Sequence, residues 1–247
     1  TLMDYKRYRL SKKEAAIVIL ESIAISVLIS KLFFDSFWGM TASPAILLIM
    51  WKKTIEQKLE ERNKKVAMEF QTMLKNVSSS LLAGFSLENA FVEAEKELKQ
   101  MYGEKSYMFL ELQNINKKVG MNIPLEEPLE DLAERTGMED IYNFIDILSF
   151  AKRAGGNFVE IIDNTINKMW AKYETAREID VAISAKKLEQ KVMSVIPVVL
   201  LAYMKLTSAE YMSVLYGNVA GVLFMTVCLL AYGGAIYLAG KILQIKV

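Results

Sequence analysis

The stretch RAGGNF, residues 153–158, places two glycines between two segments that have helical patterns. Glycine adopts the left-handed backbone conformation without strain, so a glycine here ends one helix and turns the chain into the next. A phosphate-binding loop would follow a strand and continue with Gly-Lys-Ser or Gly-Lys-Thr, and this stretch does neither. We therefore interpret Gly155 and Gly156 as a corner between two helices, with Asn157 capping the second helix.

The same pattern occurs at two earlier places in the chain. LLAGFSLENAF, residues 81–91, and KVGMNIPLEEPL, residues 118–129, each place a glycine between two helical patterns. Gly84 and Gly120 stand 36 residues apart, and Gly155 follows 35 residues later. Each copy predicts a helix, a corner with a left-handed glycine, and a second helix. The copies together predict a bundle of about six helices.

Apolar residues between these corners recur every three or four positions, which is the period of an amphipathic helix. One such stripe comprises Val66, Phe70, Leu74, Val77 and Leu81, and another comprises Ile141, Phe144, Ile145 and Leu148. No alternating run is long enough to predict a sheet. We expect both stripes to face the core of the helical bundle.

Charge is concentrated in the middle of the chain, and the two ends are apolar. Residues 52–191 contain 21 Lys or Arg and 24 Asp or Glu, whereas the flanks contain 9 basic and 5 acidic residues. Four apolar runs that predict membrane spans lie in the flanks, at residues 15–34, 37–51, 192–206 and 219–239, and the second and third are short and contain a proline each. The sequence thus predicts an all-α membrane protein with a helical bundle between two pairs of transmembrane helices.

The positions of the basic residues predict the orientation of the spans. Lysines and arginines precede the first span, follow the second and follow the fourth. By the positive-inside rule, both termini and the central bundle are cytoplasmic. The predicted parts are a basic N-terminus (1–14), two spans (15–51), a cytoplasmic domain (52–191), two spans (192–240) and a cytoplasmic tail (241–247).

Three short motifs in the central domain resemble the type II secretion F domain. The first runs from Leu82 to Leu87 and is followed by Ala90, the second runs from Leu132 to Gly137, and the third runs from Ala151 to Asn157. The resemblance covers about residues 66–197 and extends to the flanking spans. Pro128, where the family often has alanine, and a two-residue expansion before it depart from the family pattern.

The resemblance implies an inner-membrane platform protein of type IV pili or secretion systems. A single F domain between two pairs of spans is similar to the platform subunits of tight-adherence (Tad) pili. The implied partners are a hexameric secretion ATPase, pilin subunits, membrane lipid, and a second F-domain protein or another copy of this chain. The implied location is the cytoplasmic membrane. The implied role is to couple the ATPase to pilin extraction and filament assembly.

The polar residues at the corners are the candidate contacts for such a partner. We expect them to lie on the surface of the cytoplasmic domain, where they cap helices, pair with neighbours or bind the ATPase. They are Glu88, Glu134, Arg135, Lys152, Arg153 and Asn157.

Other functional classes have less support in the sequence. The chain has no histidine and one cysteine, Cys228, so a metal site is not expected and we expect no cofactor. No nucleophile stands beside a base, which argues against an enzyme. The central domain has no basic stripe that would bind nucleic acid. A transporter or channel subunit is the main alternative, because Glu21 is an acidic residue inside the first span.

Overall fold

The computed structural model describes residues 3–35, 43–154, 158–216 and 218–242 of the chain. It is 87% helical and has no strand in the described ranges, which confirms the all-helical class. The elements in chain order are α1 (Lys12–Ile29), η1 (Ser30–Phe34), α2 (Ser43–Leu82), α3 (Leu87–Tyr102), α4 (Tyr107–Val119), α5 (Glu126–Thr136), α6 (Glu139–Ala154), α7 (Phe158–Thr207), α8 (Ala209–Tyr216) and α9 (Val219–Ile242). All are α-helices except η1, which is a π-helix.

These elements form two compact units. Unit 1 comprises Thr1–Arg9 and Ile55–Thr175, and unit 2 comprises Leu10–Thr54 and Ala176–Val247. Helices α3 to α6 belong wholly to unit 1, whereas α2 and α7 each contribute to both units.

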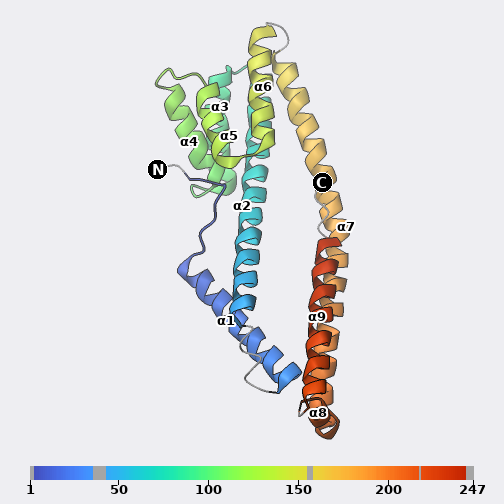
Figure 1. Ribbon diagram of the computed structural model, residues 1–247. Helices are drawn as coiled ribbons and strands as arrows, with labels where there is room; N and C mark the ends of the chain where they lie inside the picture. Colours follow the sequence, from blue (N-terminus) through green and yellow to red (C-terminus); the bar gives the residue numbers. More distant parts are fainter. Residues whose placement is uncertain (1–2, 36–42, 155–157, 217, 243–247) are drawn as a thin grey trace. The chain divides into compact units, whose positions relative to one another are not determined.

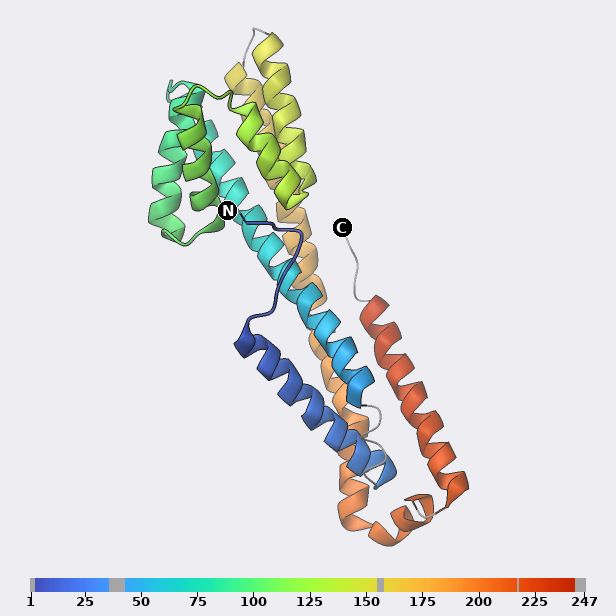
Figure 2. The ribbon, with the colours of Figure 1, turned by 60° about the vertical axis from the view of Figure 1, so that its left-hand side comes forward.

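The core of unit 1 is built from the predicted apolar stripes. All nine stripe residues are buried, as the helical period predicts. Phe70 of α2 meets Phe144 of α6 edge to face, with ring centroids 6.2 Å apart. Figures 1 and 2 show α3 paired with α4 and α5 paired with α6, and these pairs are in direct contact. Each fully buried aromatic or aliphatic side chain contributes about 1.5–3 kcal/mol to stability, so the stripes stabilise the unit.

The first predicted corner has the expected geometry. Gly84 has a φ of 90°, and it lies between α2 and α3. The hydroxyl of Ser86 then accepts a hydrogen bond from the backbone N–H of Asn89 at 3.3 Å and caps α3. Glu88 follows in the first turn of α3, where the helix dipole favours an acidic side chain.

The prediction of a left-handed glycine at Gly120 is wrong. Gly120 ends α4, but its φ of −62° is right-handed, and its N–H still bonds the carbonyl of Asn116 at 2.9 Å. The chain completes a further turn, and Asn122 adopts the positive φ of 62° instead. Asparagine tolerates this conformation better than most residues, so the reversal does not need the glycine. Gly155, Gly156 and Asn157 lie outside the described residues.

Two further corners lie between the predicted ones. Gly103 and Gly137, with φ of 80° and 66°, end α3 and α5. Each interval of about 35 residues therefore contains a second turn, which joins one helix–corner–helix copy to the next.

Unit 2 contains all or part of each helix that suits a membrane. Among the described residues, three segments are long and apolar enough to cross a bilayer, namely Lys12–Phe34, Val159–Thr207 and Val219–Ile242. The second of these begins in unit 1. They contain the first, third and fourth predicted spans, and α7 continues through Pro197. The second predicted span, 37–51, begins in residues that are not described and ends inside α2.

A cluster at one end of unit 2 joins η1 to α7, α8 and α9. Leu32, Phe33 and Met225 are buried together there. The ammonium group of Lys205 lies 2.5 Å from the carboxylate of Asp35, and it also lies over the ring of Tyr216. These contacts join residues from the two connections that the predicted topology places on the same side of the membrane.

Candidate functional site

Unit 1 contains a largely buried ion pair between α4 and α5. Arg135 donates two hydrogen bonds to Glu111, from Nη1 to Oε1 at 2.7 Å and from Nη2 to Oε2 at 2.5 Å. The side chain of Glu111 is 3% exposed, and that of Arg135 is 15% exposed. The Nε of Arg135 also donates to Asp131, one turn earlier on α5, at 3.1 Å. This two-pronged geometry is the strongest form of an arginine–carboxylate pair.

The N-terminal segment, residues 3–9, docks onto this ion pair, and we call it the strap. Tyr5 is 2% exposed, and its hydroxyl donates to Glu111 Oε1 at 2.9 Å. The backbone N–H of Tyr5 donates to the carbonyl of Arg135 at 3.1 Å, and Arg135 Nη1 donates to the carbonyl of Met3 at 3.2 Å. The tyrosine ring meets Tyr107 edge to face, with centroids 6.0 Å apart. The strap therefore completes the surroundings of the buried Glu111 carboxylate.

Two other elements hold the strap in place. Arg62 of α2 donates from Nη2 to the carbonyls of Tyr5 at 2.7 Å and Arg7 at 3.0 Å. Its guanidinium also lies over the rings of Tyr5 and Tyr8. A Cβ added at Gly137 would lie 3.1 Å from Cε of Lys6, so the corner after α5 leaves room for the strap.

The surroundings of this site shift the pKa values of Tyr5 and Arg135. Burial, then the negative charge of Glu111 and its hydrogen bond, raise the pKa of Tyr5 above its ordinary value. Burial alone would lower the pKa of Arg135, but the hydrogen bonds and charge of Glu111, with those of Asp131, raise it. The tyrosine therefore remains a donor and the arginine remains a cation at neutral pH. This arrangement binds and positions the strap.

The predicted partner contacts are spread over three helices of unit 1. Glu88 at the start of α3 and Glu134 in α5 are exposed, and Arg153 is exposed in the last turn of α6. Arg153 donates from Nε to the carbonyl of Ser149 in the preceding turn. Arg135, in contrast, is occupied by the internal ion pair. Asn157 lies outside the described residues.

Lys152 has a partner inside the chain. Its ammonium group lies 2.7 Å from the carboxylate of Glu126 at the start of α5, and the two side chains are 41% and 23% exposed. Burial alone would raise the pKa of Glu126, but the hydrogen bond and charge of Lys152 and a backbone hydrogen bond lower it. The pair is therefore charged at neutral pH, and its contribution to stability is lost only as the pH falls through the lowered pKa.

Across the described ranges, no three His, Cys, Asp or Glu side chains lie close enough to hold a metal ion. Glu21 is exposed on α1, whereas the buried side chains of α1 are Val18, Ser22 and Ser26. It therefore lies on the face of the helix that is open to lipid or to another chain.

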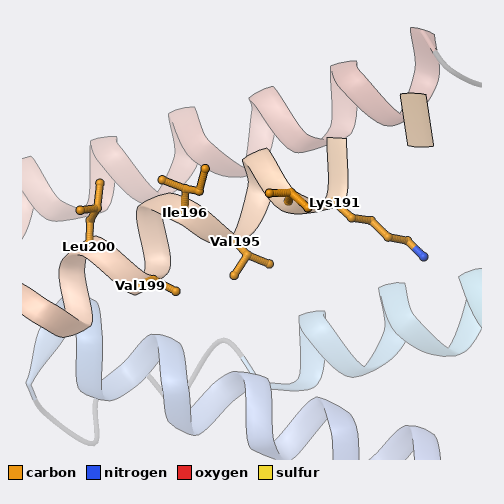
Figure 3. Close-up of a pocket in the computed structure, with 6 residues that line it drawn as sticks. Lys191, Val195, Ile196, Val199 and Leu200 are labelled. Carbon is orange, nitrogen blue, oxygen red and sulfur yellow. The ribbon is translucent and has the colours of Figure 1, made fainter. Parts of the chain in front are cut away.

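Unit 2 carries an apolar groove of about 420 Å³ along α7. Its lining residues are Lys191, Val192, Val195, Ile196, Val199 and Leu200. Figure 3 shows the Lys191 side chain reaching away from the labelled apolar side chains. The groove is thus apolar along its length and has a cation at one end.

Comparisons with protein-family models, with curated proteins and with solved structures each find no match for this chain.

Glu111, Tyr5 and Arg62 were not predicted from the sequence as site residues. A signal was present for Glu111, because it falls on the buried face of α4 among Met108, Leu112 and Ile115. An acidic residue on an apolar stripe predicts a buried partner of opposite charge. No comparable signal marks Tyr5, whose partner lies 106 residues away in the sequence.

Proposed function

We propose that this chain is a non-enzymatic platform subunit of the cytoplasmic membrane for assembly of a type IV or tight-adherence pilus. In this role, unit 1 binds a hexameric secretion ATPase, and the spans of unit 2 gather pilin subunits. The proposal rests on the resemblance of the three F-domain motifs and on their order between apolar spans. We expect the ATPase partner to supply the energy from ATP hydrolysis, because this sequence carries no ATP-binding loop.

The observation that supports the proposal most is that α2 and α7 each contribute to both units. Unit 1 is charged on its surface and packed around a large apolar core, whereas unit 2 contains all or part of each membrane-suited segment. Each of these two helices therefore carries residues of both units along one stretch of chain. A subunit that passes a partner's movement into the membrane needs covalent continuity of this kind.

The exposed residues at the end of α6 are the proposed contact with the ATPase. Arg153 is the clearest candidate, because its guanidinium contacts only a backbone carbonyl in the described residues. Lys152 forms an ion pair with Glu126, so its charge is less available to a partner than that of Arg153. Glu88 and Glu134 are exposed acidic residues that a basic partner surface would meet.

Replacing both Lys152 and Arg153 with glutamate is expected to reduce filament assembly and ATPase recruitment at least tenfold. Reversal of two charges in a complementary interface places like charges against each other, which costs several kcal/mol. Filaments would be counted by electron microscopy, and recruitment would be measured by crosslinking in membranes with equal amounts of each variant.

A charge swap separates the partner contact from the internal pair. Lys152→Glu together with Glu126→Lys restores opposite charges within the chain but keeps position 152 acidic. We expect this variant to be stable and to remain defective when combined with Arg153→Glu. Full recovery in the swap variant, or normal assembly with Arg153→Glu alone, would remove these residues from the proposed interface.

A further inference from the structure

The groove along α7 has the form of a site for an amphipathic molecule. Five of its six lining residues, which lie between Val192 and Leu200, are aliphatic, and the charged one, Lys191, stands at one end. The groove lies in the apolar stretch of a candidate membrane span, and no residue of that stretch is buried within the chain. Bilayer lipid or another helix must therefore cover it when the chain lies in a membrane.

The length of the groove fits one leaflet of a bilayer. From Lys191 to Leu200 the helix rises about 13 Å, at about 1.5 Å for each residue. Half of a typical hydrocarbon core is about 15 Å thick. A lysine at one end of such an apolar stretch therefore stands where lipid headgroups begin, and its long side chain can reach them.

A second lysine lies at the same end of unit 2. A Cβ added at Gly240 of α9 would lie 3.9 Å from Nε2 of Gln190, which directly precedes Lys191 on α7. Lys241 follows Gly240 and is exposed. Within the described residues, neither Lys191 nor Lys241 has a carboxylate partner. Lys191 and Lys241 are thus the sequence neighbours of two residues that approach each other, Gln190 and Gly240.

We propose that the α7 groove binds an anionic glycerophospholipid. The phosphate of the headgroup lies between the ammonium groups of Lys191 and Lys241, and one acyl chain lies along Val192, Val195, Ile196, Val199 and Leu200. The positive charge at one end of the groove suits the phosphate of the headgroup, and the aliphatic residues along it suit an acyl chain. A second protein helix would have to bring a carboxylate to the same end. The site requires the chain to lie in a membrane, but it does not require the platform function.

The test titrates the purified full chain, in a neutral maltoside detergent, with phosphatidylglycerol or phosphatidylcholine, and counts bound lipid by native mass spectrometry. We expect phosphatidylglycerol to bind at least tenfold more tightly than phosphatidylcholine. Lys191→Gln and Lys241→Gln are each expected to weaken phosphatidylglycerol binding about fivefold. Val195→Trp, which fills the groove, is expected to weaken the binding of both lipids.

Lys186→Gln is the matched control, because Lys186 is also an exposed lysine of α7 but pairs with Glu189 at 2.8 Å. It should leave lipid binding unchanged, and circular dichroism should show equal helicity for every variant. Equal affinity for the two lipids, or no effect of Lys191→Gln, would overturn the proposal. If millimolar inorganic phosphate displaces phosphatidylglycerol, the proposal is also overturned, because the groove then contributes nothing to the affinity for the lipid. If the chain forms dimers in which a second copy fills the groove and excludes lipid, the occupant of the groove is that second copy and the proposal is wrong.

Discussion

Replacing Arg135 with alanine is expected to destabilise unit 1 by about 3–5 kcal/mol. The replacement leaves the Glu111 carboxylate, which is 3% exposed, without its two guanidinium hydrogen bonds. It also removes the hydrogen bond that Arg135 donates to the carbonyl of Met3. The strap should therefore loosen together with the ion pair. Thermal unfolding of the full chain in detergent, followed by tryptophan fluorescence, would measure the loss, because Trp170 packs against the core of unit 1.

Two further variants identify the source of that loss. Arg153→Ala removes an exposed arginine and should change stability by no more than about 0.5 kcal/mol. Arg135→Ala combined with Glu111→Ala should be less destabilising than the sum of the two single replacements, because both act on one buried pair. If Arg135→Ala is as mild as Arg153→Ala, the ion pair is not a source of stability and the strap has another anchor.

Replacing Gly221 with alanine is expected to disrupt the packing of α8 against α9. A Cβ at this position would lie 2.8 Å from both the Cα and the carbonyl carbon of Leu215, and closer still to the carbonyl oxygen. Backbone atoms cannot move aside as a side chain can, so the helices must separate. Overpacking of this kind costs about 1–3 kcal/mol or more. The yield of folded protein and its unfolding temperature in detergent should both fall.

Gly233 provides the matched control for this replacement. It lies in the same helix, and nothing stands within 4 Å of a Cβ added there. Gly233→Ala should therefore leave stability unchanged or increase it slightly, because alanine is the better helix former. Equal behaviour of Gly221→Ala and Gly233→Ala would show that α8 does not approach α9 as closely as the structure indicates.

The features that were predicted correctly depend on short stretches of sequence. The stripe from Val66 to Leu81 follows the helical period, and every predicted member is buried. Gly84 takes the left-handed conformation that its place between two helical patterns predicts. The apolar runs are similarly local, and three of the four fall within the membrane-suited segments.

The features that were missed depend on turn length or on distant partners. Gly120 and Asn122 both tolerate the left-handed conformation, and the local sequence does not reveal which of them ends the extra turn. The ion pair of Glu111 with Arg135 joins two helices, and Tyr5 reaches it from the far end of the sequence. Such contacts are set by tertiary packing, which a helical period does not determine.

The proposed platform function requires that this chain recruits a secretion ATPase to the membrane. The most direct test captures the full chain from the membranes of its own cells after mild crosslinking, and identifies the co-purifying proteins by mass spectrometry. We predict that a hexameric secretion ATPase is recovered, with a second F-domain protein or another copy of the chain, and that Arg153→Glu reduces recovery of the ATPase. Capture of the chain without any ATPase, from cells in which the ATPase is abundant, would contradict the proposed platform function.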